Sequence, residues 1–289
     1  NWISRQCFAR THRKLAVVDG AIGFVGGINI IDDLRDVGGR RLPEPRWDFA
    51  LQVDGDVAAD IRAAFIQQWQ SLHSRYAGAL ELMRRITQPD ALHPPRSGVP
   101  QVALVARDNL RDRRTIENAY LAAIDAARET VWMANPYFAP GWRLRRALVD
   151  AAKRGVAVTL LLGKHQFRTL DWAVGALYGR LLPHGIRIAE YSRTQLHGKV
   201  AVVDRNWATV GSSNCDALSL FLNHEANLLL REHPLIVALQ QQIEHAYQRS
   251  DVVDPLAYAK RPLWQRFGNR CAYLLYRIVM KVLTIGRYR

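Results

Sequence analysis

The sequence predicts an α/β fold that contains two copies of one structural unit. A block that begins at Thr11 recurs at Leu196 without insertion, so that His12 corresponds to His197 and Asn29 to Asn214. In the middle of the chain, strand-like apolar runs alternate with helical patterns, which is typical of α/β proteins. With 289 residues, of which 49% are hydrophobic, the chain is long enough for two domains with buried cores.

The repeat continues beyond its first block in both copies. Residues 11–19 match 196–204, and Gly26-Gly27-Ile28-Asn29 matches Gly211-Ser212-Ser213-Asn214. A carboxylate then enters an apolar strand, Asp48 in the first copy and Glu225 in the second. Helical apolar spacing follows each strand, over residues 57–72 and 235–247. We therefore expect the same order of elements in both copies.

The second copy is preceded by a longer framework. Apolar runs predict strands over 102–106, 130–134, 156–162 and 186–191, separated by helices over 115–128, 142–154 and 169–182. By repeat symmetry, we expect roughly 80 to 90 residues of the first domain to be missing upstream. We predict four segments: the end of a first domain (1–88), a proline-rich linker (89–100), a second domain (101–254) and a basic amphipathic segment (255–289).

The charge balance indicates an anionic partner. The chain has 40 Lys and Arg against 26 Asp and Glu, a net charge of +14, which attracts nucleic acid, anionic lipid head groups or phosphorylated substrates. The three cysteines form no CxxC pair, which argues against a zinc ribbon or a disulfide framework and fits a reducing compartment. No apolar run reaches the roughly 18 to 20 residues that span a bilayer.

Each copy carries a histidine and a lysine two positions apart. On a strand, His12 and Lys14 would share one face, as would His197 and Lys199. Turns after each strand predict hairpins that bring small and amide residues to the same end. The predicted cross-strand pairs are Asn29 with His12, Gly27 with Lys14, Asn214 with His197, and Ser212 with Lys199.

These residue types suit chemistry at a phosphodiester. One neutral imidazole can attack phosphorus while a second, protonated imidazole protonates the leaving alkoxide. The lysines supply charge and the asparagines neutral donors for phosphate oxygens, while Gly27 and Ser212 allow close backbone approach. Asp48 and Glu225 would fix the ring tautomers, or they are ordinary carboxylates at strand starts. Asp19 and Asp204 lie at turns, where odd spacing points them away from the histidine face.

Other site classes are not supported by the sequence. Neither glycine-rich segment is followed by Lys-Ser or Lys-Thr, so a nucleotide P-loop is not predicted. No spacing of His, Cys and carboxylates indicates a metal site, and we expect neither a metal nor a cofactor.

The two motifs resemble the phospholipase D signature, His-x-Lys-x4-Asp-x6-Gly-x-x-Asn, which both copies match in full. The stretch Ala134–Pro140 and the second motif look like bacterial cardiolipin synthases, with most likeness to their B branch. The resemblance implies two α/β/α sandwich domains related by a pseudo-two-fold axis, with both histidines in one cleft. By this resemblance, the catalytic residues would be His12, Lys14, Asp19, His197, Lys199 and Asp204.

The resemblance also implies a covalent phosphohistidine, with His12 as the nucleophile and His197 as the acid and base. The implied reaction transfers a phosphatidyl group between two phosphatidylglycerol molecules and gives cardiolipin and glycerol. Phospholipid hydrolysis and nucleic-acid phosphodiester cleavage are the alternatives, although the chain lacks an evident basic-aromatic stripe for nucleic acid.

The C-terminal segment favours a lipid. From residue 262 onward, apolar side chains share one helical face and cations line its flank, a pattern typical of helices in an anionic bilayer interface. The alternative is a helix packed on the domain. We expect a peripheral protein on the cytoplasmic face of the bacterial inner membrane. The expected apolar face comprises Trp264, Phe267, Cys271, Leu274, Leu275, Ile278, Val282 and Ile285.

Overall fold

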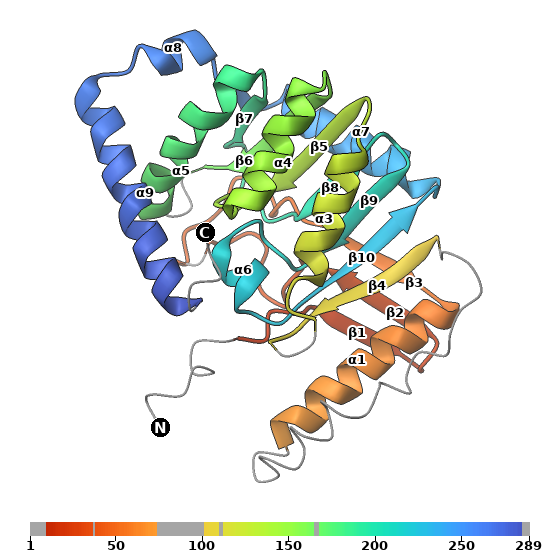
Figure 1. The fold of residues 1–289 in the computed structure, drawn as a ribbon. Coiled ribbons are helices and arrows are strands. Elements are labelled where there is room, and N and C mark those ends of the chain that lie inside the picture. Colours follow the sequence, from red (N-terminus) through yellow and green to blue (C-terminus); the bar gives the residue numbers. More distant parts are fainter. Residues whose placement is uncertain (1–9, 37, 74–100, 110–111, 165–167, 285–289) are drawn as a thin grey trace.

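The computed structural model describes residues 10–36, 38–73, 101–109, 112–164 and 168–284. The described chain forms a large sheet and a small sheet with helices around them (Figure 1). The predicted linker at 89–100 lies outside the described residues. The mixed α/β prediction is confirmed.

The first copy forms a three-stranded antiparallel sheet followed by a helix. Its strands are β1 (Leu15–Val18), β2 (Ile22–Gly26) and β3 (Ala50–Val53), in that spatial order, and α1 (Gly55–His73) follows. The inner face of this sheet packs against the core, but Val18 and Ile22 on the other face are exposed. The strand β1 is therefore covered on one face only by the described residues.

The second copy forms an eight-stranded sheet in the order β11-β7-β6-β5-β8-β9-β10-β4. Strands β5, β6 and β7 pair in parallel, and the other neighbours are antiparallel. The strands are β4 (Val102–Arg107), β5 (Thr130–Asn135), β6 (Ala157–Gly163), β7 (Arg187–Tyr191), β8 (Val200–Val203), β9 (Trp207–Gly211), β10 (Glu225–Arg231) and β11 (Asp251–Val252). The helices are α3 (Thr115–Ala126), α4 (Trp142–Lys153), α5 (Arg168–Leu181), α6 (Ala217–Phe221), α7 (Leu235–Gln248), α8 (Pro255–Ala259) and α9 (Leu263–Leu283), with a 3₁₀ turn at Leu182–His184.

The two faces of the large sheet bury different partners. Along β5, Val131 and Met133 point into a core with helices α3, α4 and α5. Trp132 and Ala134 point to the opposite face, where α7, α1 and the inner side of the small sheet pack. This alternation is the two-residue period of a strand that is buried on both sides. The small sheet is therefore held against the large one through a shared apolar core.

The repeated hairpins have the same register, which differs by one residue from the predicted register. Val18 pairs with Ile22, and Val203 pairs with Trp207. Each turn has two residues with positive φ, Asp19 and Gly20 in the first copy and Asp204 and Arg205 in the second, followed by an unpaired third residue. The predicted cross-strand partners are therefore wrong by one position. For example, the Lys199 carbonyl accepts a hydrogen bond from the Gly211 amide, so Lys199 lies opposite Gly211 and not opposite Ser212.

Helix α9 lies along α5 at one side of the molecule (Figure 1). Tyr273 and Met280 on its inner face are buried against the second domain. Gly175 in α5 permits the contact, since a Cβ there would lie 1.9 Å from the side-chain nitrogen of Asn269. Across the described ranges, helices are too short or too polar to cross a bilayer.

Candidate active site

The backbone exchanges partners between the two copies at the histidines. Thr11 forms a parallel bridge with His224, and Leu196 forms the corresponding bridge with Trp47. The His12 amide donates to the His224 carbonyl at 2.9 Å, and the His197 amide donates to the Trp47 carbonyl at 2.9 Å. Each histidine segment is thus held by the carboxylate segment of the other copy. This reciprocal exchange is the arrangement that a pseudo-two-fold relation requires.

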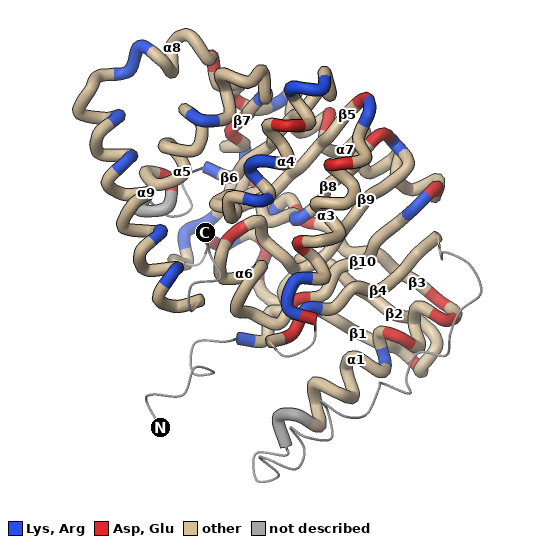
Figure 2. The backbone as a smooth tube through the Cα atoms, viewed as in Figure 1, with Lys and Arg blue, Asp and Glu red and all other residues tan. Residues whose placement is uncertain are grey.

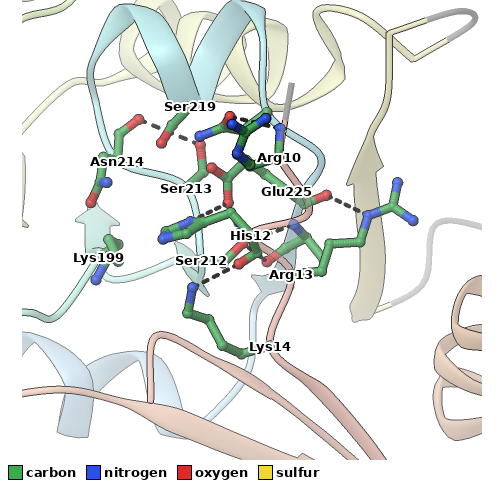
Figure 3. A network of polar contacts seen from close by, with 12 residues as sticks. Arg10, His12, Arg13, Lys14, Lys199, Ser212, Ser213, Asn214, Ser219 and Glu225 are labelled. Atoms are coloured by element: carbon green, nitrogen blue, oxygen red, sulfur yellow. Dashed lines mark hydrogen bonds and ion pairs between the residues drawn. The ribbon is translucent and has the colours of Figure 1, made fainter. Parts of the chain in front are cut away.

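The side chains follow the same exchange. His12 Nδ1 lies 3.0 Å from Glu225 Oε2, and His197 Nδ1 lies 2.6 Å from Asp48 Oδ2. The sequence analysis predicted that these carboxylates pair with the rings but not which carboxylate pairs with which ring. In the structure, each imidazole pairs with the carboxylate of the opposite copy. With Nδ1 engaged, Nε2 is the nitrogen of each ring that can act on a substrate. In Figure 3, the His12 ring points toward the region bordered by Lys199 and Asn214.

The two carboxylates are positioned by different neighbours. Ser212 Oγ donates to Glu225 Oε2 at 2.5 Å and accepts from the Ala226 amide at 3.0 Å. The equivalent position is Gly27, where a Cβ would lie 2.2 Å from Asp48 Oδ1. Gly27 and Ser212 were predicted to let a substrate approach. The structure places both against carboxylates, and direct substrate contact stays a prediction.

The lysines are anchored to the backbone beside the rings. Lys14 Nζ donates to the His12 carbonyl at 2.8 Å, and Lys199 Nζ donates to the His197 carbonyl. Lys199 is only 1% exposed, and burial lowers its pKa to about 7 although Asp48 opposes the shift. Burial also lowers the pKa of Lys14. Both ammonium groups are therefore held where little water solvates them, so an anion in the site would be attracted strongly.

Burial also lowers the pKa of His197, and the neighbouring Lys199 and Lys14 add to the shift. The hydrogen bond to Asp48 acts in the opposite direction but does not cancel it. The neutral form of this imidazole is thereby favoured in the free protein. Its side chain is 12% exposed, against 29% for His12, so the two rings have unlike surroundings.

The two motif asparagines differ in burial. Asn214 is 6% exposed, and within the described ranges its Oδ1 atom has no hydrogen-bond partner. Asn29 is half-buried in the loop after β2. An unpaired buried amide oxygen is unfavourable unless a ligand or water binds to it. Their predicted contact with substrate stays a prediction.

The motif aspartates lie away from the rings. Asp204 accepts hydrogen bonds from the backbone amides of Arg128, Glu129 and Thr130 at 2.7–2.9 Å, and so ties the β8–β9 turn to the start of β5. Asp19 lies in the exposed turn of the small sheet. This agrees with the orientation inferred from their odd spacing, so Asp204 acts as a structural residue.

Three residues near the site had no assigned role in the sequence. Asp216 caps α6 through the Ser219 amide, and burial raises its pKa to about 6. Arg13 donates to the backbone carbonyls of Glu225 and Arg107, which fixes the His12 strand to the second copy. Burial raises the pKa of Tyr137, which lies close to Asp216, to about 12. The Asp-x-x-Ser spacing could have revealed the cap, but no local pattern marks Arg13.

No group of three or more His, Cys, Asp or Glu side chains in the described ranges has a metal-binding arrangement. The described polar network consists instead of two imidazoles, two carboxylates, two ammonium groups and an amide.

Comparison with known proteins relates the second half of this site to a described family. Residues 120–247 match the family model described as "Cardiolipin synthase, PLD-like domain". This part of the chain is therefore similar to a phospholipase D-like domain of the cardiolipin synthase type. It is 37% identical over 260 residues to cardiolipin synthase B of Salmonella typhi, and 36% identical over 259 residues to cardiolipin synthase B of Escherichia coli K12. Each alignment covers 89% of this chain.

The chain spans 60% of the length of these relatives. Among solved structures, phosphatidylserine synthase of Haemophilus influenzae superposes with a TM-score of 0.70 at 14% identity. That superposition covers 96% of this chain and 71% of the other protein. At this identity the likeness supports the phospholipase D-type α/β fold alone.

Proposed function

We propose that the protein transfers a phosphatidyl group from one phosphatidylglycerol molecule to the hydroxyl of a second, giving cardiolipin and glycerol. The observation that carries the proposal is the pair of imidazoles, each with Nδ1 on a carboxylate of the opposite copy. The similarity to proteins named cardiolipin synthase B supports cardiolipin as the product. Phosphatidylglycerol as donor and acceptor follows the superfamily resemblance.

The proposed reaction has two displacements at phosphorus. In the first, His197 is protonated once the anionic substrate is bound, since the phosphate charge favours the imidazolium. His12 Nε2 attacks phosphorus, the bond from phosphorus to the head-group glycerol oxygen breaks, and His197 gives its proton to that oxygen. In the second, the hydroxyl of another phosphatidylglycerol attacks the phosphohistidine, His197 accepts the hydroxyl proton, and the phosphorus–nitrogen bond breaks. Lys14 and Lys199 stabilise the negative charge on the nonbridging oxygens. The carboxylates orient the rings and stabilise their protonated forms.

The assignment of nucleophile and acid follows the superfamily resemblance. Mass spectrometry of the acid-labile phosphohistidine, trapped by rapid quenching with phosphatidylglycerol, is expected to find the modification on the peptide that contains His12. Modification of the His197 peptide would reverse the two roles.

Vesicles of phosphatidylglycerol separate the possible reactions. Cardiolipin with glycerol as products would support the transferase, whereas phosphatidic acid would indicate a hydrolase. Nuclease activity without lipid turnover would refute both lipid reactions. His12→Ala and His197→Ala should each reduce turnover by at least about 10³-fold, because each removes a group that acts in both displacements. His184→Ala, an exposed histidine outside the site, is the matched control and should retain activity.

We also propose that α9 attaches the protein to a membrane surface, at the cytoplasmic face of the inner membrane. The face of α9 opposite its packed side is apolar and exposed, with Phe267 70% and Val282 72% exposed. The sequence allowed either a helix at a membrane interface or a helix packed on the domain. In α9, one face packs on α5 and the opposite face is exposed among the described residues. A helix with an exposed apolar face and flanking cations is suited to an anionic interface.

A further inference from the structure

A basic groove runs between α5 and α9, separate from the histidine site. It encloses about 380 Å³ and has Tyr273 among its lining residues. The cations that line it are Arg180, Arg261, Arg266, Arg270 and Arg277, and no carboxylate lines it. Figure 2 shows Lys and Arg residues (blue) spaced along α9 without an acidic residue on that helix.

The groove is built from both helices rather than from one surface stripe. The guanidinium groups of Arg180 and Arg277 lie 5.3 Å and 6.0 Å from the centre of the Tyr273 ring, and that of Arg145 lies 5.6 Å away. Tyr273 is 3% exposed, so its ring is a fixed platform that holds cations by cation–π attraction. Within the described ranges, Arg180, Arg266, Arg270 and Arg277 have no ion-pair partner.

The position of these cations on α9 indicates that the ligand is a lipid phosphate. Arg266, Arg270 and Arg277 follow one another at helical spacing, between the buried face with Tyr273 and the exposed apolar face with Leu274. If the apolar face enters the acyl region of a bilayer, this flank lies at the depth of the lipid phosphates. Guanidinium groups are well suited to bind phosphate oxygens, because their fork can donate two parallel hydrogen bonds.

We propose that the groove between α5 and α9 binds the phosphodiester head group of an anionic phospholipid, as a second lipid site apart from the two histidines. This inference rests on the proposed membrane attachment of α9 and goes beyond it, because it assigns head-group recognition to cations of two helices. The groove would hold the enzyme on membrane regions rich in its own substrate class.

Vesicle flotation of the whole protein tests the groove. The triple variant Arg180→Gln, Arg270→Gln, Arg277→Gln should bind vesicles of phosphatidylcholine with phosphatidylglycerol at least about tenfold more weakly than the wild type. Its binding to phosphatidylcholine alone should not change. The matched control carries the same charge change at exposed sites outside α5 and α9, namely Arg128→Gln, Lys153→Gln and Arg231→Gln, and should lose less than about twofold.

Two further measurements separate the groove from the membrane helix and from catalysis. Phe267→Gln with Val282→Gln should weaken binding to both kinds of vesicle, because it removes apolar contact. The groove variant should keep wild-type turnover of phosphatidylglycerol dispersed in detergent. Equal loss in the groove and control triples, or no loss in the groove triple, would overturn the head-group site while leaving the helix intact. Failure of the wild type to bind any vesicle would overturn both proposals.

Discussion

Lys199 is a buried ammonium group whose pKa is lowered to about 7 by burial. The unfolded chain has the ordinary value of about 10.4, so between these limits the unfolded state binds more protons. The contribution of Lys199 to stability is therefore unfavourable below about pH 7 and becomes less so as the pH rises toward 10. A buried ammonium group with this cost is consistent with a charge that acts on an anion in the site.

Lys199→Met should consequently stabilise the fold while abolishing catalysis. We expect Lys199→Met to have a higher Tm than the wild type at pH 6.5 and a smaller gain in Tm at pH 9.5. Turnover should fall by at least about 10²-fold, because the ammonium charge that stabilises the phosphate oxygens is removed. Thermal denaturation at the two pH values and the vesicle assay measure these effects. Lys153→Met at an exposed position is the control. A lower Tm for Lys199→Met at pH 6.5 would show that its ammonium contributes net stability.

The pairing of each ring with the carboxylate of the opposite copy predicts which carboxylate changes the pKa of which histidine. Asp48→Asn should lower the pKa of His197 further, since the negative charge that supports the imidazolium is removed. Glu225→Gln is the control and should leave the His197 titration nearly unchanged. NMR titration of the imidazole C–H signals measures both variants. A larger response of His197 to the Glu225 change would contradict the crossed arrangement.

The chemical groups of the site could be predicted from sequence, but their partners could not. The repeat predicted that His12 and Lys14 lie together, and Lys14 does bond to the His12 backbone. Both residues precede β1, however, so the strand itself does not include them. The partner of His12 is 213 positions away, and only the packing of the two copies decides that it is Glu225 rather than Asp48. The carboxylate beside Gly27 was not predicted either, because a strand pattern does not reveal that Asp48 fills the space next to this residue.

Among the secondary-structure elements, the hairpins repeat their backbone but not their anchoring. Asp204 holds three amides at the start of β5, whereas its counterpart Asp19 is exposed at the end of the small sheet. Asp204→Ala should reduce stability by about 1 kcal/mol, because three backbone amides at the largely exposed start of β5 lose their acceptor. Asp19→Ala also places alanine at a positive φ, so its backbone cost equals that of Asp204→Ala. Its loss of stability should nevertheless be smaller than that of Asp204→Ala. Urea denaturation compares the two, and equal losses would mean that backbone strain alone is responsible.

The register of these hairpins shows why turn chemistry limits prediction. The predicted cross-strand pairs require a two-residue turn at Gly20-Ala21. In the structure Asp19 also adopts a positive φ, and Ala21 donates to the Val18 carbonyl but has no partner across the hairpin. A shift of one residue changes which side chains face each other across the strands. The other helices and strands that the sequence predicted agree with the structure to within a few residues, since their apolar periods are regular. The short elements α6, α8 and β11 were not predicted.

The contact between α5 and α9 depends on glycine. Gly175→Ala would drive a Cβ into Asn269, whereas Gly179 in the same helix has open space. We expect Gly175→Ala to lower Tm and weaken vesicle binding, because α9 must move. Gly179→Ala should instead raise stability by up to about 1 kcal/mol, the ordinary helix preference for alanine. Thermal denaturation and flotation of the pair measure both effects, and an equal gain in Tm would show that α9 accommodates the methyl group.

Taken over the whole molecule, the two copies form one folding unit, because neither completes its site or its core alone. Val25 of the small sheet and Val210 of the large sheet belong to the same buried cluster as Ile61 of α1. The histidine segments are bonded across the copies as well. Loss of packing in one copy should therefore destabilise both copies.

Ile61→Ala tests this coupling. Removal of a side chain that is 0% exposed should lower the free energy of unfolding by about 2–5 kcal/mol. Native-state hydrogen exchange should then show equal loss of protection for amides of β2 and of β9, because they open in the same global event. Ile66→Ala, on the exposed side of the same helix, is the matched control and should change protection little. A loss confined to β2 would mean that the small sheet opens by itself, so that the His12 half of the site could detach from the His197 half without unfolding the molecule.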